Sequence, residues 1–118
     1  MTIIETIHAT DSLLPNSYDS LTKAGWVLEA DGMVRAEIHG EKADLTAQGK
    51  DACETDRTLA VPYPFDMIYR HYLLAMICHA NGDYTQYNNH IINYNTAFLA
   101  YESYYNRSVR QKAQRFLF

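Results

Sequence analysis

The clearest pattern in the chain is a repeat of large apolar residues in its C-terminal third. Seven positions follow a 3-4-3-4-3-4 spacing, which keeps one face of a helix apolar over about three heptads. These positions are Tyr84, Tyr87, Ile91, Tyr94, Phe98, Tyr101 and Tyr105. The spacing predicts a helix over 84–105 whose aromatic face, called the aromatic seam below, packs against another helix.

The segment before the aromatic seam is apolar on most faces of a helix. Residues 65–81 include Ile68, Tyr69, Tyr72 and Leu73, and a helix that is apolar nearly all round is expected at the centre of a fold. Pro64 suits the first turn of such a helix, and Gly82 suits a left-handed cap at its end. The turn between the predicted helices 65–81 and 84–105 has only one or two residues. A connection this short predicts that the two helices form an antiparallel hairpin.

The N-terminal residues predict a short first helix. Thr2 and Glu5 have the spacing of a capping box, in which the Thr hydroxyl accepts from a backbone N–H of the first turn. We expect this helix to run through about Ala9. It must end before Pro15, because a proline disfavours the helical conformation of the residue that precedes it, here Leu14.

A second helix is predicted from Ser17 or Asp19 to about Ile38. Either side chain can cap its start, and a carboxylate also favours the positive end of a helix. Gly25 and Gly32 each cost the helix roughly 1 kcal/mol relative to Ala, and close packing against another helix would explain them. The apolar stripe of this helix consists of Val27, Ala30, Val34 and Ile38, with Trp26 and Met33 beside it.

Residues 39–61 are the least structured part of the sequence. They are polar, carry mixed charges and include Gly40 and Gly49. We expect a loop, with or without a short hairpin, that projects or becomes ordered on a partner. The predicted fold is mainly α: a small helical bundle with a C-terminal antiparallel helical hairpin and a long polar loop. It forms a single domain over 1–106, followed by a basic tail over 107–118.

The charge of the chain is unevenly distributed. The 118 residues are 47% apolar, enough for one core, and carry a net charge of −4, which argues against a general nucleic-acid binder. Residues 1–60 contain eleven acids and five bases, whereas residues 61–118 contain three acids and five bases. An acidic part and a basic tail favour association with other copies or with another charged protein.

The basic tail leaves two interpretations open. It is either a frayed, solvated end of the chain or a docking arm that orders on a partner through charged contacts and aromatic anchors. The residues that would carry the second interpretation are Arg107, Arg110, Lys112, Arg115, Phe116 and Phe118.

The residues that most often perform catalysis or bind metals lack the spacing that such sites need. The five histidines and two cysteines form no CxxC, HxxxH or HExxH pattern. Cys78 lies in an apolar run where a thiol is buried and inert, and both it and Cys53 are expected to be free thiols in a reducing compartment. The carboxylates of residues 29–56 are interpreted as a solvated face. We therefore expect no enzyme, no metal and no cofactor, with a histidine site at His71 and His79 as the enzymatic alternative.

The sequence also argues against two other function classes, membrane proteins and nucleic-acid-binding proteins. The longest apolar run, 72–78, is far too short to span a membrane, and the N-terminus lacks the pattern of a signal peptide. Ten tyrosines allow base stacking, but strict helical spacing favours a helix–helix interface. A DNA-binding regulatory module would need a recognition helix. Only the Asn-bearing helix 84–105 fits this in part, and it lacks bases, so we expect no sequence-specific nucleic acid as a partner.

The sequence also resembles a small structural protein of tailed phages and prophages of Gram-positive bacteria. The resemblance spans nearly the whole chain apart from 40–58, and its most specific elements are Asn81-Gly82-Asp83 and Tyr87-Asn88-Asn89. The other matching stretches are Leu14-Pro15-Asn16, Trp26-Val27-Leu28-Glu29, Gly32, Glu37-Ile38, Pro62 to Tyr69, Tyr72-Leu73, Ala75-Met76-Ile77, Asn95 and Tyr104-Tyr105-Asn106-Arg107.

Proteins of that type are similar to head–tail connector (adaptor) proteins, by size and helical layout. The resemblance implies a ring of identical subunits that docks on the portal after DNA packaging, with portal and tail proteins as partners. It places the protein in the virion, at the head–tail junction, and in the cytoplasm of the host during assembly. A tail- or head-completion protein is the nearest alternative. The resemblance brings no catalytic residues with it.

Overall fold

Four helices make up the part of the chain that the structure describes. The computed structural model describes residues 1–41 and 58–117, with side chains described up to Lys112. The helices are α1 (Ile3–Leu13), α2 (Ser20–Glu37), α4 (Met67–Ala80) and α5 (Tyr84–Leu117). Within the described ranges, the only β pairing is an isolated antiparallel bridge between Thr2 and Thr58. The prediction of a mainly helical bundle is confirmed.

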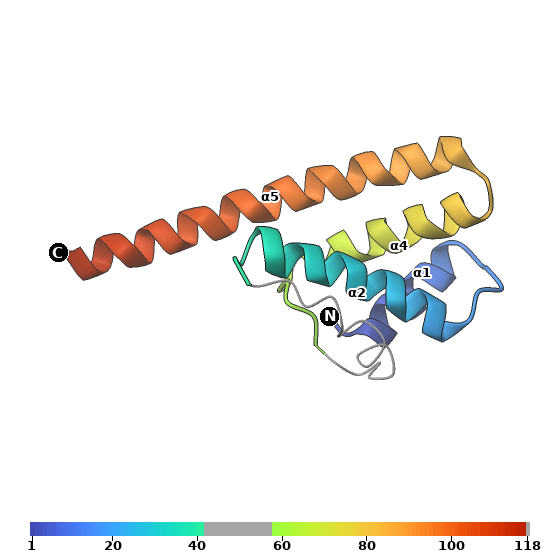
Figure 1. The fold of residues 1–118 in the computed structure, drawn as a ribbon, viewed down its shortest axis with the longest axis horizontal. Coiled ribbons are helices and arrows are strands. Elements are labelled where there is room, and N and C mark those ends of the chain that lie inside the picture. The colour runs from blue at the N-terminus through green and yellow to red at the C-terminus, as the bar shows by residue number, and fades with distance from the viewer. Residues whose placement is uncertain (42–57, 118) are drawn as a thin grey trace.

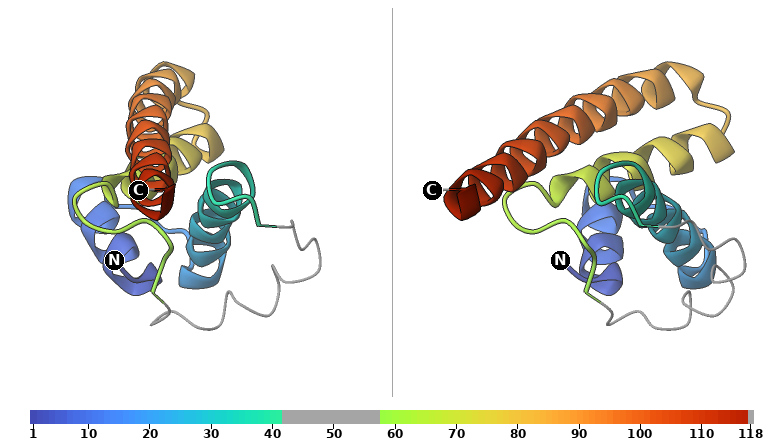
Figure 2. Two further views of the ribbon diagram at one scale, coloured as in Figure 1. Left: turned by 90° about the vertical axis from the view of Figure 1, so that its left-hand side faces the viewer. Right: turned by 60° about the vertical axis from the view of Figure 1, so that its left-hand side comes forward.

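The helices are arranged around α4. Helices α1 and α2 pack on one side of α4, and α5 runs antiparallel along its other side (Figure 1). The molecule measures 55 × 31 × 23 Å, and much of its length comes from α5, which continues past the other helices (Figure 2). The predicted C-terminal helical hairpin is therefore α4 and α5, with α4 at the centre.

Helix α1 starts as the sequence predicts but ends later. The Thr2 hydroxyl accepts from the Glu5 N–H at 3.2 Å, and Leu14 before Pro15 is extended. The expected end near Ala9 is wrong, because the helix continues to Leu13. Thr10 is fully buried in this last turn, so packing carries the helix up to the proline.

The stripe of α2 forms the part of the core that its spacing predicts. Val27, Ala30, Val34 and Ile38 are all buried, together with apolar residues of α1 and α4. The explanation of the glycines by close packing is wrong. A Cβ atom added at Gly25 or Gly32 would meet nothing within 4 Å, so neither position requires a glycine for space.

The structure confirms the predicted glycine cap at the end of α4 and corrects the predicted place of Pro64 at its start. Gly82 has a φ of +80°, the left-handed conformation expected at the end of α4. Pro64, however, does not lie in the first turn of that helix, which begins at Met67. It belongs to a preceding turn, in which the Phe65 N–H donates to the Pro62 carbonyl at 2.9 Å.

The long loop is described only at its two ends. Gly40 has a φ of +72°, and the Glu41 N–H donates to the Arg35 carbonyl at 2.8 Å. At the other end, the Leu59 N–H donates to the Met1 carbonyl at 3.0 Å. The prediction for 39–61 as a projecting loop or short hairpin concerns mainly 42–57, which lie outside the described residues.

Candidate interaction surfaces

The aromatic seam packs against the rest of the molecule along most of its length. Tyr94 and Tyr101 are buried, and Phe98 and Tyr105 are half-buried against the core. Tyr87 and Ile91 are half-buried as well. Tyr84 is the exception: it is exposed and contacts His79 edge-to-face. On the other helices, Tyr69 is fully buried, while Trp26 and Tyr72 pack half-buried on the core.

Two tyrosines, Tyr72 of α4 and Tyr94 of the aromatic seam, also connect their helices to α2 by polar contacts. The Tyr72 hydroxyl donates to Glu29 Oε2 at 2.9 Å, and the Tyr94 hydroxyl lies 4.0 Å from Met33 Sδ. Burial, with a smaller contribution from Glu37, raises the pKa of Tyr94 to about 12. Burial followed by the Glu29 contact raises the pKa of Tyr72 as well. Both hydroxyls therefore remain protonated and serve as donors at neutral pH.

A cluster of rings fastens α5 at the end of the seam. His39 Nε2 lies 2.7 Å from the Tyr101 hydroxyl, and the His39 ring stacks on Tyr105 with centroids 4.7 Å apart. Phe65 contacts Tyr101 and stacks on Tyr104 from the other side. These contacts join the ends of α2 and α4 to residues 101–105 of α5.

Sequence reasoning missed a buried polar network at the centre of the fold. Asp31 is only 2% exposed. Its Oδ1 accepts from the Tyr69 hydroxyl at 2.7 Å and from the Ala60 N–H at 2.9 Å, and its Oδ2 accepts from Arg35 Nε at 2.8 Å. The Tyr69 hydroxyl in turn accepts from the Val61 N–H at 3.0 Å. The network holds residues 60–61 against α2 and α4.

The sequence predicted that the carboxylates of residues 29–56 form a solvated face, and this prediction is wrong for Asp31. Burial, then the Asp31 charge, raises the pKa of Tyr69, and the Asp31 contact raises the pKa of Arg35. The spacing held a signal for this. Asp31 lies four residues after Val27 and three before Val34, which puts it on the apolar stripe of α2.

Beyond Tyr105, α5 continues without the rest of the molecule beside it. Residues 107–117, called the arm below, remain helical up to Leu117 and project past the other helices (Figure 1). Arg107, Val109, Arg110 and Lys112 are exposed. The helix extends through these residues and their side chains are solvated, so the choice between a solvated end and a docking arm stays a prediction. The side chains of Arg115 and Phe116 and all of Phe118 lie outside what the structure describes.

The opposite end of the molecule is formed by the two short connections between helices. Residues 13–21 and 81–84, called the turn end below, lie together at the end far from the arm (Figure 1). The Tyr18 hydroxyl donates to Asn81 Oδ1 at 2.7 Å. Asp19 and Asp83 cap α2 and α5 by accepting from the N–H groups of Thr22 and Gln86. The Thr22 contacts lower the pKa of Asp19, which keeps it charged at neutral pH.

The histidines and Cys78 do not form a metal site among the described residues. No group of three metal-ligating side chains occurs among the described residues. Burial lowers the pKa of His71 and His90, so both are neutral at pH 7. Cys78 is a buried free thiol whose pKa is raised by burial, as its apolar setting predicts. Cys53 lies outside the described residues.

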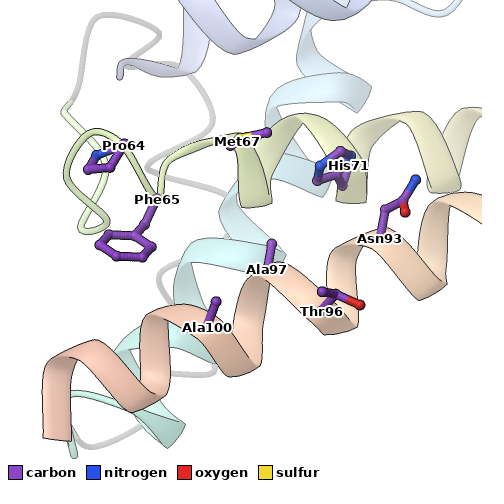
Figure 3. Close-up of a pocket in the computed structure, with 8 residues that line it drawn as sticks. All are labelled: Pro64, Phe65, Met67, His71, Asn93, Thr96, Ala97 and Ala100. Carbon is purple, nitrogen blue, oxygen red and sulfur yellow. The ribbon is translucent and has the colours of Figure 1, made fainter. Parts of the chain in front are cut away.

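An open groove of about 390 Å³ runs between the start of α4 and the middle of α5 (Figure 3). His71 of α4 and Asn93 and Thr96 of α5 are its polar members. None of its lining residues is a carboxylate. The lining residues are Pro64, Phe65, Met67, His71, Asn93, Thr96, Ala97 and Ala100.

Comparison with known proteins adds no relative to this picture. No protein-family model, no curated protein and no solved structure matches the chain. Among the described residues, no helix is both long and apolar enough to cross a membrane.

Proposed function

We propose that this chain is a virion assembly protein of a tailed phage, and specifically a head–tail connector or adaptor. Identical copies form a ring that docks on the portal and receives the tail. The protein acts by binding and performs no catalysis. Its place is the head–tail junction of the virion, and the host cytoplasm during assembly.

The observation that carries this proposal is the arm. A helical segment of eleven residues, about 16 Å long at 1.5 Å per residue, extends from a small body that it does not help to cover. Because the arm continues a packed helix, it needs no nucleus of its own and offers a preformed helical surface to another subunit. A small helical body with a projecting arm suits a subunit that joins neighbours within a ring.

The decisive experiment is deletion of the gene in an inducible prophage that encodes it. Electron microscopy of the induced lysate should show unattached tails beside filled heads that lack tails. Complementation with the full chain should restore joined virions, whereas complementation with residues 1–106 should not. Normal, infectious virions from the deletion strain would contradict the proposal.

A regulatory DNA-binding module is the second candidate, and the basic arm is the observation that favours it. Its bases would contact phosphates, and binding would weaken steeply with salt. A gel-shift assay at low salt separates the two candidates. The connector proposal expects no shift of duplex DNA by the isolated protein.

A further inference from the structure

The two ends of the molecule carry opposite charge. Residues 1–106 hold fourteen acids and six bases, a net charge of −8, whereas the arm holds four bases and no acid. The arm is part of a continuous helix that points away from its own body. Among the described residues, no ion pair joins one of its bases to an acid of the same chain, and a second copy offers an acidic surface.

The turn end has the features that complement the arm. Its two ranges contain Asp19 and Asp83 but no Lys or Arg, and both carboxylates are exposed. It also carries three exposed large side chains, because Leu13, Leu21 and Tyr84 are 61%, 58% and 61% exposed. The arm correspondingly exposes Val109 between its bases. Apolar contact framed by opposite charges is the composition of a specific interface.

We propose that the arm of one copy docks on the turn end of the next, so that copies join head to tail. The inference deepens the proposed function by naming the two surfaces that form the contact between subunits. Such a contact is heterologous, since each copy uses a different surface on each side, and it closes into a ring or continues as a filament according to its rotation. A polyanion is the less suitable occupant of the arm, because the body at −8 repels it.

The test measures self-association of the full chain by sedimentation at two salt concentrations, about 50 mM and about 500 mM. At the higher concentration the exposed charges are screened. The wild type should associate and dissociate as salt rises. Arg107→Glu/Arg110→Glu/Lys112→Glu should abolish association. Asp19→Asn/Asp83→Asn should weaken it about tenfold, while the caps persist because Asn caps helices as well as Asp.

Matched apolar variants locate the contact. Leu21→Ser should weaken association, whereas Leu99→Ser should leave it unchanged, although Leu99 is equally exposed at 60%. Leu99 lies in the middle of α5, away from both ends. Equal effects of the two substitutions would overturn the assignment of the turn end. Circular dichroism of each variant verifies that the fold is retained.

Mixing the two charge variants tests whether the contact is head to tail. The arm variant keeps an intact turn end, and the turn-end variant keeps an intact arm, so the mixture should form dimers with the wild-type affinity, which neither variant reaches alone. A monomeric wild type, or a mixture that stays monomeric, would overturn the inference. A monomeric wild type that shifts DNA in a gel would assign the arm to nucleic acid. The prophage deletion decides the proposed function separately, because its readout is the virion.

Discussion

The two parts of α5 belong to one helix but differ in what their side chains contact. Residues 84–105 are rich in aromatics, pack on α4 and end in the ring cluster of His39, Tyr101 and Tyr105. The arm has no aromatic residue up to Lys112 and exposes Arg107, Arg110 and Lys112 to solvent. The first part is explained by the fold it stabilises. The second part contributes no buried residue to the core that the structure describes, and we therefore propose that it binds another copy.

Some of the arm's charge has a local explanation. Basic residues near the C-terminal end of a helix interact favourably with its dipole, by about 0.3–1 kcal/mol each. This stabilises the helical state of the arm but does not account for exposed Val109 or for its projection beyond the body. The arm should therefore be a preformed helix that needs little ordering when it binds, which favours affinity.

The largest expected effect comes from removing a ring at the end of the seam. Tyr101→Ala deletes a buried aromatic side chain and its contact with His39, and should lower the free energy of unfolding by about 3–5 kcal/mol. Val109→Ala, on the arm, should change it by less than about 0.5 kcal/mol. Urea denaturation of both variants measures this difference, and equal losses would erase the distinction between the two parts.

The Asp31 network should be the next most sensitive point. Asp31→Ala leaves the Tyr69 hydroxyl and the Ala60 N–H without their acceptor in a buried setting, and should cost about 3 kcal/mol. Glu37→Ala, on an exposed position of the same helix, is the matched control. A loss below about 1 kcal/mol for Asp31→Ala would mean that residues 60–61 are held by other contacts.

A smaller, opposite effect is expected at Gly32. The position is exposed and an added Cβ meets nothing within 4 Å, so Gly32→Ala should stabilise α2 by about 0.5–1 kcal/mol. Thermal unfolding should move upward by a few degrees. Association between copies should not change, which makes the variant a stable background for substitutions in the arm. A lower melting temperature would show a packing constraint at Gly32.

The smallest effect is expected from pH. Burial lowers the pKa of His71 and His90 in the folded protein, so below about pH 6.5 the unfolded chain binds more protons than the folded one. Their contribution to stability is complete above that pH and decreases as the pH falls through it. Melting temperatures at pH 7.5 and pH 5.5 should differ less for His71→Gln/His90→Gln than for the wild type. An unchanged difference would assign the pH dependence to other groups.

The sequence predicts the architecture well where one period dominates. The 3-4 spacing identified the burial of Tyr94 and Tyr101, and the stripe of α2 identified Val27 and Val34. It failed at Tyr84, which contacts α4 at His79 but lies beyond the end of that helix and stays exposed. It also failed at Asp31, because the burial of this carboxylate depends on hydrogen-bond donors that are distant in sequence.

The candidate interaction surfaces were predicted only in part. The bases of the tail were visible as a charge run, but a polar segment without apolar periodicity gives no indication that the helix continues to Leu117. The turn end was not predicted at all. Its members, Leu13, Leu21 and Tyr84, come from three separate helix ends, and only the fold brings those ends to one side of the molecule.

We expect the arm to serve association and not folding. Truncation after Asn106 tests it most directly, with circular dichroism, thermal unfolding and sedimentation measured on the same sample. We expect a folded, soluble helical protein whose melting temperature lies within about 3 °C of that of the full chain and which no longer associates. Loss of soluble folded protein, or association equal to that of the full chain, would contradict it.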